Sequence, residues 1–358
     1  MSRIDAFLEL VVNQGGSDLH LISGNPPRMR LHGDIYPVKF RTLNEVEAMD
    51  LLIEIMPDQK RREFDLHGNV DFSYQIPDIS RYRVNVFKHI DGIGAVFRVI
   101  PDNIQSLDDL NLPAILKNMC RHRHGLILVT GPTGSGKSTT LAAMIDQVNQ
   151  ERKGHIITIE DPIEYVHSNK SCLVSQREVG AHTKKFSYAL RSALREDPDV
   201  ILVGEMRDLE TISLAVTAAE MGILILGTLH TNSAAATIER IINVFPAGDE
   251  PYIRAMLSTS LCGVISQQLV RHADGRSRVA AVEVMLNNTA VSNIIREGKP
   301  EQLQNVIQSG SMQGMQSLDS ALRKLLDEKT ISGIEAYKKA HQKEHFEQYR
   351  LLQDEMFT

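Results

Sequence analysis

Residues 131–138 form a pattern that binds phosphate, since they read Gly-Pro-Thr-Gly-Ser-Gly-Lys-Ser. A glycine, four residues and then Gly-Lys-Ser is the phosphate-loop pattern, which serves nucleotides when a strand precedes it and a helix follows. Here the apolar run 126–130 predicts the strand and residues 139–148 predict the helix. Because an incidental glycine-rich turn would lack these flanks, the sequence predicts a nucleotide site.

The predicted site binds ATP through consecutive residues of this loop. Its glycines let main-chain N–H groups converge on a polyanion, and the amino terminus of the helix adds positive potential. We expect Lys137 to reach the β and γ phosphates and Ser138 to ligate Mg²⁺. The predicted cofactor-binding residues are Gly131, Pro132, Thr133, Gly134, Ser135, Gly136, Lys137, Ser138 and Thr139.

Polar side chains able to do chemistry follow later apolar runs of the sequence. Short unbroken apolar runs are typical of buried parallel strands, and ligands bind at the carboxyl ends of such strands. We therefore expect these side chains to meet around the phosphate loop. They are Glu160 and Glu164 after residues 156–159, Glu205 after residues 200–203, and His230 after residues 223–229.

Transfer of a phosphoryl group to water needs magnesium, an oriented water and cations on the transition-state oxygens. Glu205, on a strand expected beside that of the phosphate loop, is predicted to hold Mg²⁺ with Ser138, commonly through water. Glu164 is our choice for polarising the attacking water, with Glu160 its nearest rival, and His230 is expected to contact the γ phosphate. The alternatives are a helix cap or surface ion pair for each carboxylate and a core position for the histidine.

Arginines supply the candidate cations. Arg191 and Arg195 are four residues apart, which predicts one helix face just before the turn at 197–199. Arg83 and Arg98, near Arg81, lie early in the chain and would complete the site from another domain or subunit. As isolated residues, all of these arginines would instead be surface solubilisers.

The helices and strands that must position these residues fall into two groups along the chain, which predicts two domains. The length of 358 residues also indicates two domains. We expect a small α+β domain over 1–100, a polar linker over 101–113, and an α/β domain with a parallel sheet over 114–289. The region 290–358 is predicted to be mostly helical, with a solvated helix over 335–356.

Composition excludes several classes of protein. The 39 basic and 45 acidic side chains leave a net charge of -6, so no direct nucleic-acid partner is expected. No apolar stretch approaches the roughly 20 residues of a membrane-spanning helix, and the first residues lack the apolar core of a signal peptide, which predicts a cytoplasmic chain. Cys120, Cys172 and Cys262 favour neither a disulfide framework nor a zinc site at 120–124.

With these residues in hand, the chain resembles the PilT-type retraction ATPases of type IV pili, within the larger family of secretion ATPases. The resemblance runs from end to end and is much more specific than the phosphate loop alone. The matching segments are Ser17-Asp18-Leu19-His20, residues 81–98, the phosphate loop, residues 158–164, Gly204-Glu205, the histidine segment 227–232, residues 264–269, and residues 294–299.

The resemblance implies a PAS-like amino-terminal domain joined to a RecA-like ATPase domain and assembled as a homohexamer. It also implies a cytoplasmic protein that is peripheral to the inner membrane and engages a platform protein in that membrane. Through the platform protein the ATPase would withdraw pilin indirectly, which gives twitching motility. The family's roles fall on Lys137, Ser138, Glu164, Glu205, His230, Arg191 and Arg195, with Arg83 and Arg98 as the inter-domain cations.

Two features bear on the direction of force. Retraction enzymes usually carry an arginine where this chain has Ser292, a departure that counts against retraction. The chain lacks the added amino-terminal domain and four-cysteine zinc motif of many pilus-extension and type II secretion relatives, which favours retraction. One alternative is a pilus-extension or type II secretion ATPase, and another is a catalytically weak accessory paralogue of the motor. A third is a nucleic-acid motor built on the same core. The negative charge and the few aromatic residues disfavour the nucleic-acid motor.

Overall fold

The computed structural model describes residues 2–31, 33–100, 104–275 and 277–350. It divides into two compact units, Met1–Asn103 with Glu164–Val166, and Ile104–Ile163 with His167–Thr358. Of the expected linker, residues 101–103 lie outside the described residues. Residues 104–113 belong to the second unit, where Leu107 and Leu112 are buried in the core.

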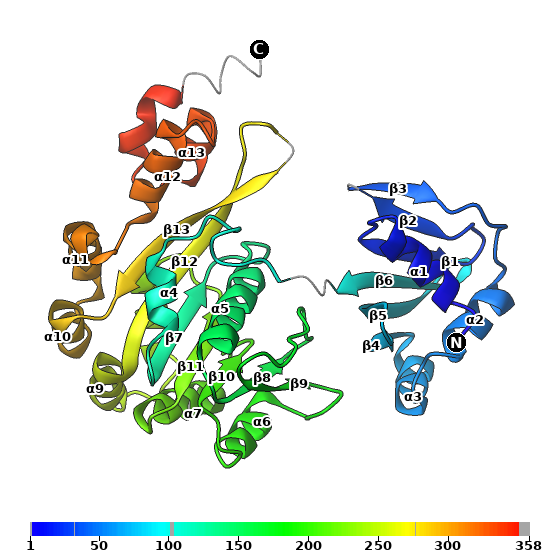
Figure 1. Cartoon of the computed structure of the whole chain (residues 1–358), viewed down its shortest axis with the longest axis horizontal. Coiled ribbons are helices and arrows are strands. Elements are labelled where there is room, and N and C mark those ends of the chain that lie inside the picture. The colour runs from blue at the N-terminus through cyan, green and yellow to red at the C-terminus, as the bar shows by residue number, and fades with distance from the viewer. Residues whose placement is uncertain (1, 32, 101–103, 276, 351–358) are drawn as a thin grey trace. The chain divides into compact units, whose positions relative to one another are not determined.

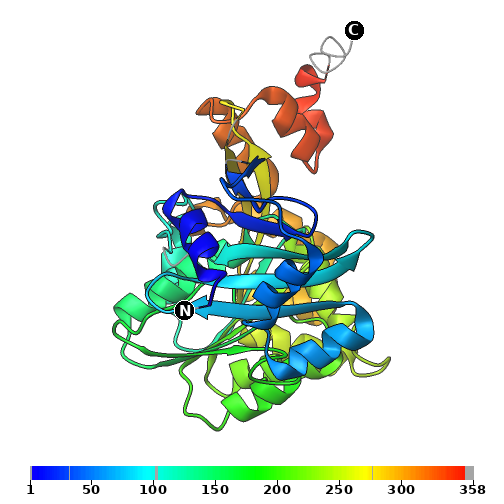
Figure 2. The ribbon, with the colours of Figure 1, turned by 90° about the vertical axis from the view of Figure 1, so that its right-hand side faces the viewer.

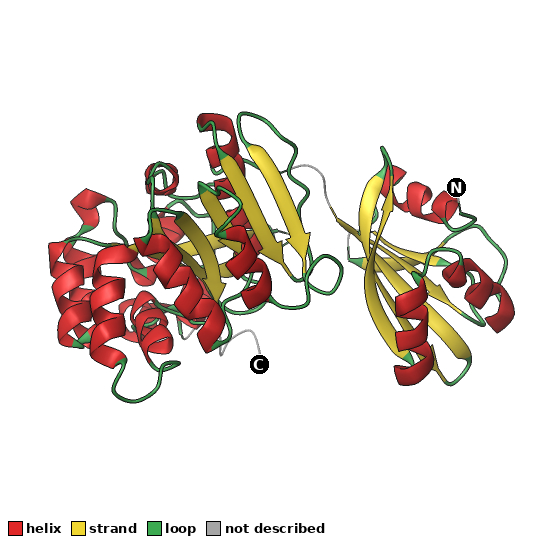
Figure 3. Ribbon diagram, turned by 90° about the horizontal axis from the view of Figure 1, so that it is seen from below, coloured by secondary structure: helices red, strands yellow, loops and turns green. Residues whose placement is uncertain are grey.

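The first unit is an antiparallel sheet in the order β3-β2-β1-β6-β5-β4. Figure 3 shows its helices on one face of the sheet. Strand alternation explains this, because Tyr82, Val84 and Phe97 point into the core under the helices while Arg83 and Arg98 point to the opposite face. The elements are α1 Asp5–Asn13, β1 Asp18–Ile22, β2 Arg28–Leu31, β3 Asp34–Pro37, α2 Glu45–Ile53, α3 Asp58–His67, β4 Asn69–Ile76, β5 Ser80–His89 and β6 Gly92–Ile100.

The second unit is built on a sheet in the order β13-β12-β7-β11-β10-β8-β9. The strands from β12 to β9 pair in parallel, and β13 pairs antiparallel at the edge. The apolar runs predict four of these parallel strands, β7, β8, β10 and β11, but not β9 or β12. The strands are β7 Gly125–Thr130, β8 His155–Glu160, β9 Leu173–Glu178, β10 Val200–Val203, β11 Leu224–Leu229, β12 Leu261–Arg271 and β13 Arg278–Leu286.

One predicted neighbour is wrong. The strand that ends before Glu205, β10, does not lie beside β7, because β11 pairs with both and separates them. A crossover can insert a strand between two others without leaving any mark in the local sequence.

Helices cover both faces of this second sheet (Figure 1). Alternate residues of β7 enter the two cores: Ile127 and Val129 pack with α4 and α5, whereas Leu126 and Leu128 pack with the helices of the other face. The helices are α4 Ile115–Cys120, α5 Lys137–Glu151, α6 Phe186–Ala193, α7 Leu209–Glu220, α8 Ala234–Ile242, α9 Glu250–Ser260, α10 Thr289–Glu297, η1 Pro300–Gln302, α11 Leu303–Ser309 and η2 Ser311–Gln313.

The chain from 318 to 350 forms a small helical cluster near the end of the β12–β13 pair (Figure 2). It contains α12 Leu318–Asp327, α13 Gly333–Lys339 and η3 Lys343–Tyr349. The solvated helix expected over 335–356 is therefore wrong within the described residues. The helix stops because the Asp319 carboxylate accepts the main-chain N–H groups of His341 and Gln342 at 2.8 and 2.9 Å, and Phe346 is buried against α12. Residues 351–356 of the expected helix lie outside the described part of the chain.

Among the helices of the described segments, none has the length and apolar character that a bilayer crossing requires.

Candidate active site

The phosphate loop connects the end of β7 to the start of α5, as predicted. Gly131, Gly134 and Gly136 have φ values of 144°, 76° and 87°, a region that favours glycine. A Cβ at Gly131 would also lie 2.3 Å from the carbonyl oxygen of Gln267 on β12. The N-cap residue of α5 is Gly136, which makes no side-chain cap hydrogen bond. The first N–H groups of this helix are therefore placed for an anion.

Lys137 lies over the loop. Its ammonium nitrogen donates to the carbonyl oxygens of Gly131 at 3.0 Å and Pro132 at 3.1 Å, and the side chain is buried. The neighbouring Ser135 hydroxyl is also buried. This arrangement holds one positive charge at the point where the main-chain amides converge.

Glu205 and His230 lie together beyond the ends of β10 and β11. His230 Nε2 is 3.0 Å from Glu205 Oε1, and the guanidinium of Arg207 pairs with the same oxygen. The hydrogen bond and charge of Glu205 raise the pKa of Arg207. The main-chain N–H of Met206 donates to the carbonyl oxygen of Thr228 at 3.0 Å, which fixes the two strand ends together. Sequence reasoning missed Arg207, although its place two residues after Glu205 was a usable signal.

The two rival carboxylates, Glu160 and Glu164, differ in their surroundings. Glu160 Oε1 accepts the Thr158 hydroxyl at 2.6 Å and the Gln176 side-chain amide at 3.3 Å. Glu164 is exposed and is grouped with the first compact unit. The structure thus ties Glu160 into the sheet and leaves the Glu164 side chain in solvent.

The prediction of one helix face for Arg191 and Arg195 is wrong. Helix α6 ends at Ala193, and Arg195 lies in the following turn, where its N–H bonds the Ser192 carbonyl oxygen three residues back at 2.9 Å. The chain leaves the helix because Asp197 precedes a proline and has a φ of 52°. Arg191 remains on α6 and pairs with Glu210 at 2.7 Å.

Arg83 and Arg98 are cross-strand neighbours on the face of the first sheet away from its helices. Arg98 Nε donates to Asp18 Oδ1 at 2.9 Å, and Arg83 lies 3.7 Å from Asp71. Although burial by itself raises the pKa of Asp18, hydrogen bonds from Ser17 and Arg98 bring it below its usual range. Asp18 is therefore a charged anchor for Arg98.

A third group of polar contacts fixes the start of α5 to β12. Gln267 is buried on β12, and its side-chain amide bonds both Ser135 and Thr140. A cavity of about 870 Å³ adjoins these residues and is lined in part by Leu112, Gly136 and Leu269. Sequence reasoning missed Gln267. The available signal was the polar run Ser-Gln-Gln at 266–268, between apolar residues of the same strand.

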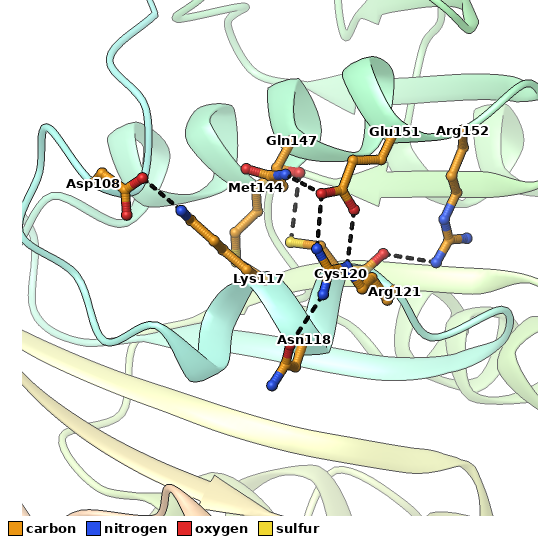
Figure 4. A network of polar contacts seen from close by, with 9 residues as sticks. All are labelled: Asp108, Lys117, Asn118, Cys120, Arg121, Met144, Gln147, Glu151 and Arg152. Carbon is orange, nitrogen blue, oxygen red and sulfur yellow. Dashed lines mark hydrogen bonds and ion pairs between the residues drawn. The ribbon is translucent and has the colours of Figure 1, made fainter.

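Cys120 and Arg121, at the start of the segment 120–124, contact residues of α5 (Figure 4). The Cys120 thiol contacts the carbonyl oxygen of Met144 at 3.6 Å, and burial raises the pKa of Cys120 to about 12, which disfavours the thiolate that metals bind. Arg121 pairs with Glu151 of α5 through two contacts of 3.1 Å. Across the described residues, no three or more His, Cys, Asp or Glu side chains are grouped as a metal site.

Comparison with known proteins decides the family. The family described as type II/IV secretion system protein matches residues 1–351. The chain belongs to this family. Members of the type II/IV secretion system family that resemble it include the type IV pilus retraction ATPase PilT of Pseudomonas aeruginosa, 50% identical over 96% of this chain and 99% of the relative. A twitching motility protein of Neisseria gonorrhoeae is 48% identical over 89% of this chain and 85% of its own.

A solved structure agrees with this assignment to the secretion system family. The crystal structure of the pilus retraction motor PilT with bound ADP superposes with a TM-score of 0.90 and 43% identity, covering 97% of this chain and 99% of that one. The predicted fold class, a small α+β amino-terminal domain followed by a RecA-like α/β domain with a helical carboxyl-terminal region, is confirmed.

Proposed function

We propose that this chain is an ATPase that hydrolyses ATP to ADP and phosphate and drives retraction of type IV pili. The observation that carries the proposal is the phosphate loop at the start of α5, in a chain that matches a retraction ATPase over almost the whole length of both proteins. The overall identity extends the assignment beyond a general phosphate site, which many unrelated enzymes share.

The nucleotide binds to the second unit, at the phosphate loop and in the cavity beside it. Main-chain N–H groups of the loop and the first turn of α5 hold the β and γ phosphates, and the Lys137 ammonium exchanges its loop carbonyls for phosphate oxygens. The nucleoside occupies the adjoining cavity of about 870 Å³, which has the size of a small-ligand site. Apolar walls at Leu112 and Leu269 suit a flat base.

Magnesium fits the donors at this site. Mg²⁺ prefers oxygen ligands and in phosphate sites takes few from the protein, the rest coming from water and phosphates. The Ser138 hydroxyl and the Glu205 carboxylate, at the head of α5 and beyond β10, are donors of this kind. When bound, the ion neutralises charge that develops on the phosphate oxygens.

Glu164 polarises the attacking water. We prefer it to Glu160 because Thr158 and Gln176 already bond the Glu160 carboxylate. His230 contacts the γ phosphate and is held by Glu205, so loss of that phosphate changes the position of the segment leading into α8.

The arginines act across a homohexamer. Arg191 and Arg195 supply cations to the transition state, and Arg83 and Arg98 reach the nucleotide of a neighbouring subunit. The ring lies at the cytoplasmic face of the inner membrane, engages a platform protein and moves pilin indirectly. A site completed by a second copy ties hydrolysis to subunit movement.

The enzymatic test compares purified wild type with Lys137→Ala. We expect the variant to lose magnesium-dependent ATP turnover and ADP binding while keeping its circular dichroism spectrum. Lys184→Ala removes an exposed lysine of the same unit and is the matched control. Full turnover by Lys137→Ala would contradict the proposed site.

The cellular test deletes the gene and scores surface pili and twitching. We expect abundant pili and no movement, which the wild-type gene restores and the Lys137→Ala gene does not. Bald cells would indicate an extension ATPase instead, and normally moving pili would indicate an accessory paralogue.

A further inference from the structure

Gln267 joins the phosphate loop to the first turn of α5 from a neighbouring strand. Its side-chain Nε2 donates to the carbonyl oxygen of Ser135 at 2.6 Å, and its Oε1 accepts the hydroxyl of Thr140 at 2.8 Å. Ser135 and Thr140 lie on opposite sides of Lys137 in the sequence. A single side chain therefore bridges the loop and the helix on either side of the lysine.

The location makes these contacts strong. Gln267 is 1% exposed and Thr140 is also 1% exposed, so water does not compete for their polar atoms. A buried amide without partners costs far more than its hydrogen bonds contribute when made. Parallel pairing of Ser266 with Thr130 brings β12 alongside the end of β7, so the loop begins directly against the main chain of Gln267.

We propose that Gln267 is a positioning residue of the nucleotide site, which holds the loop amides and the start of α5 in the arrangement that receives phosphate. It acts through Ser135 and Thr140, without itself touching the phosphates. This inference rests on the proposed function, in that the loop must bind the nucleotide.

The chemistry requires an amide. One end of the side chain must donate to a carbonyl oxygen and the other must accept from a hydroxyl, and glutamine does both within one planar group. Glutamate has the same shape but replaces the donor with a second acceptor, so an oxygen would face the Ser135 carbonyl oxygen. Its charge would also lie on the wall of the site that binds an anion.

The experiment measures ADP affinity by titration calorimetry, ATPase KM and kcat, and the melting temperature without nucleotide, for full-length Gln267→Glu. We expect KM and the ADP dissociation constant to rise about tenfold or more. We expect kcat to stay within about threefold, because a pre-formed loop contributes to binding of substrate and transition state alike. Gln268→Glu places the same charge one residue on, where the strand points to the other face, and is the matched control.

Thr140 gives an independent test if Gln267→Glu fails to fold. Thr140→Val removes the hydroxyl at constant shape and should weaken ADP binding several-fold, whereas Thr140→Ser keeps the hydroxyl and should lie closer to wild type. Unchanged ADP affinity and KM in Gln267→Glu, or equal effects of valine and serine at 140, would overturn the inference. If Lys137→Ala also bound ADP normally, the phosphate site itself would be wrong, so the two failures are distinguishable.

Discussion

Acid should destabilise this protein through His167, in the segment between β8 and β9. The side chain is 8% exposed, and burial lowers the pKa of His167 to about 4. Two charged groups act on it in opposite directions, since Asp146 of α5 raises the pKa and Lys170 lowers it. Burial prevails, so the folded protein keeps this imidazole neutral at pH values where an unfolded histidine is protonated.

The sign and size follow from proton linkage. The ordinary histidine pKa is 6.5, so between pH 6.5 and about 4 the unfolded state binds more protons and the folded state loses stability as pH falls. Each unit of pKa difference is worth about 1.4 kcal/mol, so the full loss, reached well below pH 4, is about 3.5 kcal/mol. At pH 4, where the folded imidazole is half protonated, the loss is about 3 kcal/mol. By pH 5 the expected loss is about 2 kcal/mol.

The assay is urea unfolding without nucleotide, followed by circular dichroism because the chain contains no tryptophan. Carboxylates also titrate in acid, so the quantity to compare is the difference between wild type and His167→Gln. We expect this difference in unfolding free energy to shift by about 2 kcal/mol against the wild type between pH 7.5 and pH 5. His124→Gln, at an exposed histidine of the same unit, is the control. A wild-type-to-variant difference that does not change with pH would refute a neutral, buried His167.

Further outcomes are expected at three carboxylates. Glu205→Gln should lower kcat by about two orders of magnitude or more while ADP binding persists, measured by steady-state turnover and calorimetry. Asp18→Asn should reduce the free energy of unfolding by about 1 to 3 kcal/mol at pH 7, because it removes the charged partner of Arg98. This gap should close in urea melts as pH falls through the lowered Asp18 pKa. Burial raises the pKa of Glu283, whose Oε1 accepts the N–H of Ala234 at 2.8 Å, so ionised Glu283 costs stability. The melting temperature of Glu283→Gln should therefore rise relative to that of the wild type as pH rises above about 4.5. A difference in melting temperature that does not change with pH would contradict this expectation.

The sequence alone determined the features that local patterns encode. The glycines at 131, 134 and 136 specify positive φ values, and a short apolar run before them with a helix after them specifies a loop between strand and helix. Continuous apolar runs made four of the buried parallel strands predictable, namely β7, β8, β10 and β11. The meeting of Glu205 with His230 followed from the rule that such strands end at one edge.

The tertiary structure alone decided which elements are neighbours. Three contacts join residues that are distant in sequence. They are the pairing of β11 between β7 and β10, the hydrogen bond from Gln267 to Ser135, and the turn at 341–342 that Asp319 stabilises. Arg195 lies outside α6, and not on the same helix face as Arg191, because the helix ends at Ala193 before the turn at Asp197. Such contacts depend on the order in which crossovers place whole strands and helices, and packing of that kind leaves no periodic signal in the segments that it joins.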